Sequence, residues 1–343
     1  MILALAIAVI VVALSFDFTN GFNDAANAIA TSVSTRALKP RAAFTLAAGM
    51  NLVGALLGTA VATTIAKEII HITMIDPEDQ LIIIVSALLG AITWNLTTWY
   101  LGMPSSSSHS LIGGLVGAGF SASLYHPEVH VQWIQIVYKV IEPMLFSPII
   151  GFTCAFIVMT IFQWVFRKRN PGKTFSAFKK AQIFSSAALA LGHGLQDAQK
   201  SMGIIFMAAA AAGIGGITHA DSDIPLWIKC ACAGAIGLGT FVGGKKIMTT
   251  LGSKIVDVDP ARGFAAESVS AIVLYVTAFF IHAPISTSHT VTSSILGSGA
   301  TKSMRSVNWG TAINIVKTWF ITMPAAALVA FIIHEILRLL FLI

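Results

Sequence analysis

Long apolar blocks alternate with short polar stretches along the whole chain. A helix needs about 20 apolar residues to cross a bilayer, and the blocks that approach this length are 1–35, 42–66, 80–101, 105–124, 131–166, 181–213, 226–244, 262–283, 285–300 and 307–341. Polar residues interrupt the first and the sixth block. Pro143, Pro148 and Pro324 lie inside blocks 131–166 and 307–341, where a kink or break is expected. The pattern predicts an all-α polytopic membrane protein.

The composition supports this class. Only 10% of the residues are charged, whereas soluble domains carry about 25%, which excludes a soluble enzyme and a disordered chain. The net charge of +6 does not indicate nucleic-acid binding, because the basic residues lie in short runs between apolar blocks. The three cysteines have neither zinc-site nor disulfide-framework spacing. The first block has no basic residue and leads into polar residues 17–27, so we expect a membrane helix and not a cleaved signal.

Basic and acidic loops alternate between the blocks. Basic residues gather in loops 36–41 and 167–180, in a loop with Lys245, Lys246, Lys254 and Arg262, and at Lys302 and Arg305. The alternate loops carry Glu68, Asp76, Glu78, Asp79, Glu128, Asp221 and Asp223. Basic loops stay in the cytoplasm. The protein is therefore predicted to lie in the cell (inner) membrane with both termini on the extracytoplasmic side.

This orientation predicts two inverted repeats. Five passes precede the basic loop 167–180 and five follow it, so the second half must enter the membrane upside down. The predicted organisation is a first inverted repeat at 1–166, a basic cytoplasmic linker at 167–180 and a second inverted repeat at 181–343, with broken helices and re-entrant hairpins as an option.

Two motifs occur once in each half, in the same order. Residues 20–27, NGFNDAAN, match residues 193–200, HGLQDAQK, and residues 104–110, PSSSSHS, match residues 284–290, PISTSHT. The match continues in the pairs Gly117 and Gly297, Gly119 and Gly299, Trp133 and Trp309, and Pro148 and Pro324. Matching motifs in one order indicate an internal duplication.

The first motif places a carboxylate and amides inside each half. An ionisable residue within a membrane span is a functional candidate, because burying it is costly. Asp24 and Asp197 are such residues, and glycine beside each is expected to weaken the helix and turn carbonyls inward. Carboxylate, amide and hydroxyl oxygens suit a small hard cation. The candidate cation ligands are Asn20, Asn23, Asp24, Ser108, Gln196, Asp197 and Ser288. The alternative is that each aspartate only caps a broken helix.

The second motif indicates an anion site. Proline followed by Ser or Thr marks a helix N-terminus, where free N–H groups, the helix dipole and hydroxyls favour negative charge. Blocks 80–124 and 262–300 each contain such a break, so each is predicted to form a hairpin. Two such ends, one per inverted half, can converge near the midplane. Alternatively, the hydroxyls are ordinary caps and packing residues.

Other ionisable residues have more than one reading. Lys200 can pair with Asp197, three residues earlier on the same helix face, or meet the anion, and the two roles are compatible. His109 and His289 follow the hydroxyl runs and act either as fixed hydrogen-bond partners or as proton shuttles. Glu267 opens the span before the second hairpin and is a further candidate for proton or ion coupling.

These residues resemble the inorganic phosphate transporter (PiT) family. Residues 21–28, GFNDAANA, look like its duplicated GANDVANA-type signature, and residues 104–109 and 284–289 look like its P-I-S-x-T/S-H motifs. The resemblance implies a secondary transporter built of inverted repeats, moving phosphate with cations as a homodimer. It implies a phosphate site lined by Asp24, Asn27, Ser105, Ser106, Ser107, Asp197, Ser286, Thr287 and Ser288. Lys200 is added to this set because of its charge, not because of the resemblance. Gln196, Lys200 and Ser105 depart from the family pattern, which leaves the coupling ions open.

The predicted function is sodium-coupled symport of inorganic phosphate by alternating access, with Na⁺ as coupling ion, no cofactor and no enzymatic activity. Proton coupling, a metal–phosphate substrate and sulfate transport are close alternatives. A passive anion channel would need no intramembrane acids. An intramembrane hydrolase is disfavoured, because the sequence has no G-x-S-x-G elbow.

Overall fold

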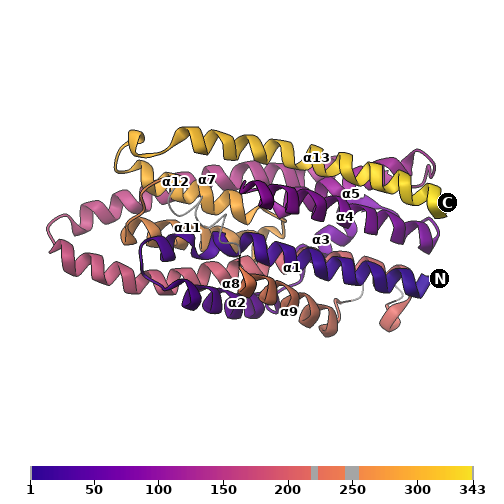
Figure 1. Cartoon of the computed structure of the whole chain (residues 1–343), viewed down its shortest axis with the longest axis horizontal. Helices are drawn as coiled ribbons and strands as arrows, with labels where there is room; N and C mark the ends of the chain where they lie inside the picture. Colours follow the sequence, from indigo (N-terminus) through magenta and orange to yellow (C-terminus); the bar gives the residue numbers. More distant parts are fainter. Residues whose placement is uncertain (1, 218–222, 244–254, 342–343) are drawn as a thin grey trace.

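The computed structural model describes residues 2–217, 223–243 and 255–341. Nearly all of them are helical (Figure 1). The first half holds α1 (Ile2–Ser34), α2 (Pro40–Ala55), α3 (Ala60–Glu68), α4 (Pro77–Leu101), α5 (Ser107–Ser123), and a last segment of α6 (Trp133–Ile136), the π-helical turn η1 (Val137–Ile141) and α7 (Glu142–Phe166). The second half holds α8 (Pro171–Ala211), η2 (Ile214–Gly216), α9 (Leu226–Val242), α11 (Pro260–Val276) with the π-helical turn η4 (Thr277–Ile281), α12 (Thr287–Ala300), η5 (Met304–Ser306) and α13 (Trp309–Phe341).

Five of the described helical segments are long and apolar enough to cross a membrane. They are Ile2–Ser34, Pro77–Leu101, Trp133–Phe166, Pro260–Ile281 and Trp309–Phe341, and the pair α2 and α3, bent by 66°, would make a sixth. The remaining predicted blocks are shorter helices or, in the case of the 41-residue α8, have a polar centre. The all-helical class with several apolar helices is confirmed.

Both predicted hairpins are present. The chain leaves α4 through Gly102 and leaves η4 through His282, both in the left-handed conformation, with φ of 68° and 57°. It then passes Pro104 or Pro284 and enters α5 or α12. Two short strands, β1 (Ile70–His71) and β2 (His130–Val131), pair antiparallel ahead of α4 and α6, and a bridge between Val256 and Val307 stands at the corresponding place in the second half.

Two expected interruptions of helices are wrong. The helices α1 and α8 run unbroken through Gly21 and Gly194. A Cβ on Gly21 would lie 2.3 Å from the carbonyl oxygen of Ile236 in α9, and one on Gly194 would lie 2.1 Å from that of Asn51 in α2. These glycines therefore permit close helix packing and do not open the backbone.

The prolines of the last segments do not break their helices either. Pro148 lies inside α7 and Pro324 inside α13, and both helices continue past them. Transmembrane helices tolerate proline in this way because neighbouring groups satisfy the freed backbone carbonyl. Pro143 directly follows the π-helical turn η1, where the hydrogen-bond pattern of the helix is already irregular, and the segment continues through it.

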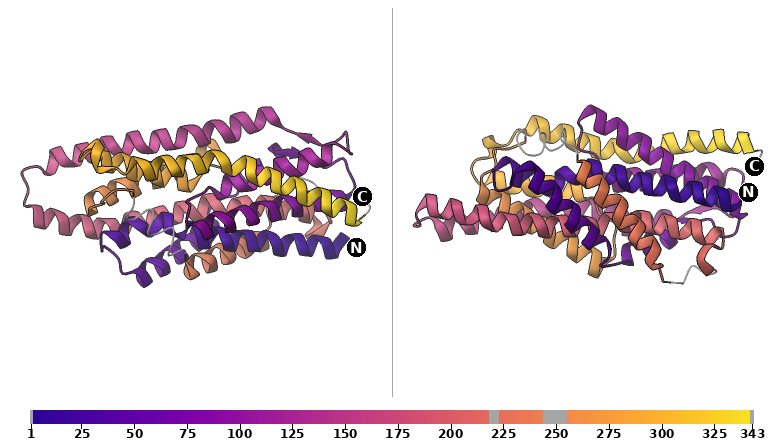
Figure 2. Two further views of the ribbon diagram at one scale, coloured as in Figure 1. Left: turned by 45° about the horizontal axis from the view of Figure 1, so that its top comes forward. Right: turned by 60° about the horizontal axis from the view of Figure 1, so that its bottom comes forward.

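Matched helices make matched contacts across the two halves. The helix α1 packs on α9, and its counterpart α8 packs on α2. Likewise α5 packs on α13, and α12 packs on α7 (Figures 1 and 2). The second helix of each hairpin therefore packs against the last helix of the other half.

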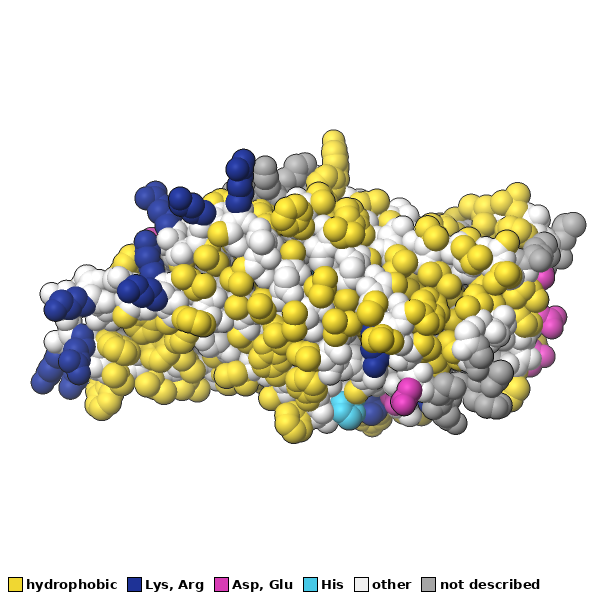
Figure 3. All heavy atoms as spheres, turned by 90° about the horizontal axis from the view of Figure 1, so that it is seen from below, with side chains coloured by type: hydrophobic (Ala, Val, Ile, Leu, Met, Phe, Trp, Pro, Cys, Tyr) yellow, Lys and Arg dark blue, Asp and Glu magenta, His cyan; other side chains and the backbone are white. Residues whose placement is uncertain are grey.

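The charged side chains are separated along the long axis. On the face shown in Figure 3, most Lys and Arg side chains gather at one end of the molecule and Asp and Glu lie toward the other, where Lys139 and Arg338 pair with Glu68 and Glu335. Both termini lie at this acidic end (Figure 1). Lys245, Lys246, Lys254 and Asp221 of the predicted loops lie outside the described residues.

Candidate functional site

The carboxylate of Asp24 in α1 lies between the starts of the two hairpin helices. Ser107 of α5 donates to its Oδ2 at 3.0 Å, and Ser288 of α12 donates to its Oδ1 at 3.0 Å. The Asn27 amide, one turn further along α1, is 2.9 Å from the same Oδ1 and 2.7 Å from the Ser288 hydroxyl. All four side chains are buried. Both copies of the second motif, at the starts of α5 and α12, thus contact the first motif in its first-half copy on α1.

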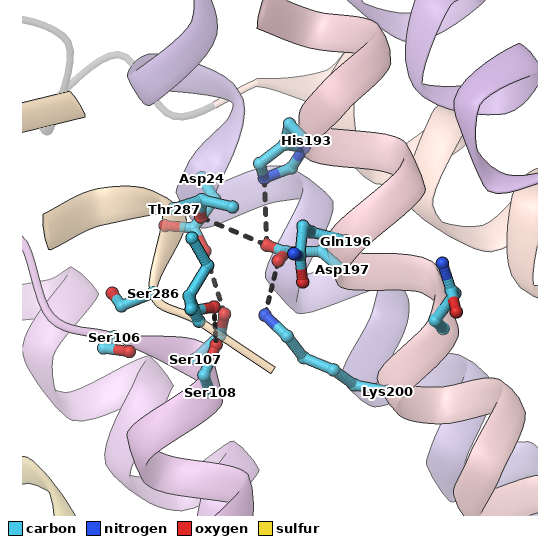
Figure 4. A network of polar contacts seen from close by, with 12 residues as sticks. Asp24, Ser106, Ser107, Ser108, His193, Gln196, Asp197, Lys200, Ser286 and Thr287 are labelled. Carbon is cyan, nitrogen blue, oxygen red and sulfur yellow. Dashed lines mark hydrogen bonds and ion pairs between the residues drawn. The ribbon is translucent and has the colours of Figure 1, made fainter. Parts of the chain in front are cut away.

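The carboxylate of Asp197 in α8 has two basic neighbours on its own helix (Figure 4). Lys200 forms an ion pair with Oδ1, and the Nε2 of His193 lies 3.1 Å from Oδ2. Thr287 at the start of α12 donates to Oδ2 at 3.3 Å. Of the two roles expected for Lys200, the structure displays the pairing with Asp197.

The two carboxylates belong to one cluster. One ligand atom each from Asp24, His193 and Asp197 lie within 4.8 Å of one another. Figure 4 shows Ser106, Ser107, Ser108 and Ser286 approaching this cluster from the hairpins, opposite His193 and Lys200. Residues far apart in the sequence therefore form a single buried polar centre.

The hydroxyls of the two runs have different partners. Ser106 and Ser286 are the N-caps of α5 and α12, and each accepts from the backbone N–H of the histidine three residues later at 3.2 Å. Ser108 donates to the carbonyl of Ile285 at 2.8 Å and so ties the two hairpins together. Ser105 is 2.7 Å from the Thr98 hydroxyl and does not contact the carboxylates in the described structure. The residues that face the carboxylates are Ser107, Thr287 and Ser288.

Four amide oxygens of the first motif accept no hydrogen bond from any described residue. They belong to Asn20, Asn23, Asn27 and Gln196, all of them buried. The amide nitrogens of Asn23 and Gln196 make corresponding contacts in the two halves. That of Asn23 is 3.4 Å from the carbonyl of Asn95 in α4, and that of Gln196 donates to Thr277, the first residue of η4, at 2.8 Å. Buried polar atoms are usually paired, so these oxygens are candidate ligands for a cation.

Comparison with known proteins decides the family. The sequence profile of the phosphate transporter family matches residues 20–330, a range that contains both copies of both motifs. The chain belongs to the phosphate transporter family. The resemblance derived from the motifs is thereby confirmed.

Relatives of this transporter cover it almost completely. It is 47% identical over 343 residues to a probable low-affinity inorganic phosphate transporter of Bacillus subtilis (strain 168), covering 99% of each chain. It is 44% identical to a protein of the same name from Rhizobium meliloti (strain 1021), covering 95% of this chain and 94% of the relative. A solved structure of a protein named the sodium-dependent phosphate transporter superposes with a TM-score of 0.88 at 25% identity, over 98% of this chain and 99% of that chain. The relatives are named as transporters, in agreement with the expectation of no enzymatic activity.

The two motif histidines of the transporter lie beside the polar centre and contact each other. The ring centroids of His109 and His289 are 4.6 Å apart, and His289 stacks on Trp319 at 3.9 Å. Both rings line a mostly apolar cavity of about 430 Å³ between α7 and α13. Their ring contacts indicate a packing role, whereas their backbone N–H groups complete the two helix caps.

Glu267 of the transporter belongs to a second buried cluster. Its carboxylate accepts from Thr31 of α1 at 2.5 Å, from Gln182 of α8 at 3.0 Å and from Ser185 of α8. Thr31 lies seven residues after Asp24, so this cluster is displaced along α1 toward the basic end.

Sequence reasoning missed three contributors to the site. His193 was visible only as the residue aligned with Asn20, although it lies four residues before Asp197, on the same helix face. Its Nδ1 is 3.1 Å from the amide oxygen of Asn51 in α2, whose nitrogen donates to Thr240 of α9 at 2.7 Å. The contacts of Asn51 and Thr240 join different helices, so no local sequence pattern predicts them.

Proposed function

We propose that this transporter carries inorganic phosphate together with sodium by alternating access. The observation that carries the proposal is the meeting of two hydroxyl-bearing helix N-termini, one from each half, at two buried carboxylates. A helix N-terminus and its hydroxyls favour an anion, whereas carboxylates and amide oxygens favour a cation. One buried centre thus offers ligands to both charges.

Phosphate would bind at the starts of α5 and α12. The first N–H groups of a helix have no intrahelical partner, and Ser107, Thr287 and Ser288 add hydroxyl donors there. Lys200 supplies a positive charge close by, although it is paired with Asp197. Monoprotonated phosphate can also donate a hydrogen bond to a carboxylate. Sulfate cannot do so, and this difference favours phosphate.

Sodium would bind beside the phosphate. Asp24 and the unpaired oxygens of Asn23 and Gln196 form an oxygen-rich set, and the structural relative is named for its dependence on the same ion. A cation at this set offsets the charge of a neighbouring anion. Each ligand therefore strengthens binding of the other, by equal factors in the two directions.

The architecture suits alternating access. The matched contacts of α1 with α9 and of α8 with α2 support two inverted repeats. The separation of charge supports a cytoplasmic basic end and extracytoplasmic termini. The resemblance to the PiT family further implies a homodimer in the cell membrane, which light scattering of the purified protein would test.

Uptake of radiolabelled phosphate into proteoliposomes tests the proposal. At fixed pH, accumulation is expected only with an inward sodium gradient. Phosphate entry that needs neither a sodium gradient nor a pH gradient, and that stops when the inside and outside concentrations are equal, would support a passive channel and contradict symport. Radiolabelled sulfate in the same vesicles tests the anion preference.

Proton coupling is the second candidate, and Glu267 supports it. This carboxylate is buried and has no lysine or arginine partner among the described residues, so a proton or another cation must balance its charge. Phosphate uptake driven by a pH gradient without sodium, and lost in Glu267→Gln, would favour this candidate over sodium.

A further inference from the structure

A further buried carboxylate lies outside both the central cluster and the Glu267 cluster. Asp17 of α1 is completely buried, seven residues before Asp24 toward the acidic end of the molecule. Its Oδ1 accepts a hydrogen bond from the Ser201 hydroxyl of α8 at 2.7 Å. Its Oδ2 has no hydrogen-bond partner in the described part of the chain. The thiol of Cys232 in α9 faces the same carboxylate, but a thiol is a weak donor and brings no charge.

Asn20 lies between Asp17 and Asp24 on the same face of α1. It is three residues after Asp17 and four before Asp24, so its side chain is a neighbour of both. Asn20 is completely buried, and neither its amide oxygen nor its amide nitrogen has a partner among the described residues. An amide with both ends unpaired in a membrane interior indicates a ligand that the polypeptide itself does not supply.

The charges around Asp17 do not balance. Five carboxylates are buried among the described residues: Asp79 lies in the first turn of α4, whereas Asp17, Asp24, Asp197 and Glu267 lie deeper in the bundle. Lys200 is paired with Asp197, and Asp17 forms no ion pair in the described structure. Even a protonated His193 would sit at Asp197, not at Asp17. A buried carboxylate without a partner is strongly disfavoured in a membrane, so Asp17 requires a positive charge from solution.

We propose that Asp17, Asn20 and Ser201 form a second cation site, selective for an ion of the size and charge of Na⁺. One carboxylate oxygen, one amide oxygen and one hydroxyl oxygen provide hard ligands. A single carboxylate suits a monovalent ion, and one carboxylate with the lone thiol of Cys232 falls short of the three or four Cys, His or carboxylate ligands that hold zinc. The site lies between the acidic end and the central cluster, and Asn20 lies beside both. The proposal rests on sodium coupling and adds an ion to the one at the central cluster.

Equilibrium binding of ²²Na⁺ to the purified full-length protein tests the site. Asp17→Asn keeps the shape of the side chain and an acceptor for Ser201, but removes the charge. The variant is expected to bind one Na⁺ fewer per chain than the unaltered protein, with the central ion retained. Asp79→Asn is the matched control: Asp79 is also a buried carboxylate, but His126 lies 3.6 Å from it, and its variant should bind as many ions as the unaltered protein.

Ser201→Ala provides an independent variant, because it keeps the carboxylate and removes one ligand. We expect an unchanged number of ions and a weaker apparent affinity for Na⁺. If Asp17→Asn does not give a monodisperse protein, the Ser201→Ala titration decides, and an unchanged affinity overturns the site.

The same measurements separate this site from the proposed function. Equal ²²Na⁺ binding by Asp17→Asn and the unaltered protein overturns the second site but leaves sodium-coupled uptake intact. Phosphate uptake that ignores sodium, in a protein that still loses one bound ion on Asp17→Asn, overturns the coupling and leaves the site. No bound sodium in the unaltered protein overturns both.

Discussion

The hydroxyl of Ser288 donates a 3.0 Å hydrogen bond to Oδ1 of Asp24, and this bond connects the two halves of the chain. Asn27 contacts both groups. An anion that binds at the start of α12 must compete for the Ser288 hydroxyl. Losing that donor leaves the Asp24 carboxylate more dependent on a cation. The geometry therefore provides a direct physical route by which the phosphate and sodium proposed to bind here would strengthen each other's binding.

Removing the charge of Asp24 or of Asp197 should strongly reduce sodium-stimulated phosphate uptake. We expect Asp24→Asn and Asp197→Asn each to insert normally but to show sodium-dependent uptake reduced by about tenfold or more. A factor of this size is typical of the coupling free energy between two ligand sites. Uptake into proteoliposomes measures the effect, and Asp79→Asn serves as control. Normal uptake by both variants would contradict a cation site at these carboxylates.

Neighbouring serines should separate a structural role from a binding role. Ser106 caps α5, whereas Ser107 faces Asp24. Ser106→Ala should cost about 1 kcal/mol of stability by loss of the cap, with little change in the KM for phosphate. Ser107→Ala should raise the KM for phosphate or sodium with a smaller change in melting temperature. The reverse pattern would show that the cap itself binds the substrate.

The ion pair of Lys200 and Asp197 should reveal itself in a double-mutant cycle. Lys200→Gln leaves a buried carboxylate without its ion pair, which costs about 3–5 kcal/mol. Adding Asp197→Asn removes that charge, so the double variant is expected to melt at a higher temperature than Lys200→Gln alone. Thermal unfolding in detergent without sodium or phosphate measures this. Additive effects of the two changes would show that the pair does not contribute to folding.

The glycines of the first motif should not tolerate a methyl group. In Gly194→Ala the new Cβ would collide with the Asn51 carbonyl, at 2.1 Å in the present packing, so α2 and α8 would have to separate. Overpacking of this kind costs about 1–3 kcal/mol. Gly234→Ala in α9 is the control, because nothing lies within 4 Å of its added Cβ. Equal melting temperatures of the two variants would contradict the packing role.

Much of the fold was accessible from the sequence. Apolar blocks fixed the helical class, and Pro104 and Pro284 located the hairpins. The continuity of α1 and α8 could not be predicted, because a glycine that breaks a helix and one that admits a neighbouring backbone look alike in sequence. Only the presence of Ile236 or Asn51 beside the glycine separates the two cases.

The site was predictable where charge stood in an apolar block and less so elsewhere. Asp24, Asp197 and the hydroxyl runs were identified because polar groups are costly in a membrane. Which serines cap a helix and which donate to Asp24 depends on where each side chain points at the start of its helix. The Glu267 cluster and the partners of His193 depend on long-range packing between α1, α2, α8 and α11.

Gly21 of α1 fits against α9, and Gly194 of α8 fits against α2, so the first helix of each half is seated in the other half. The hairpin helices α5 and α12 are held in the same crossed manner by α13 and α7. Because α8 already begins at Pro171, the connection between the halves is only residues 167–170, and a hinge there would have to pull all these backbone contacts apart. The alternating access proposed above would therefore not move one half of the sequence against the other. A block that moves as a rigid body would carry helices from both halves, and sliding would occur along surfaces that lack these glycine contacts.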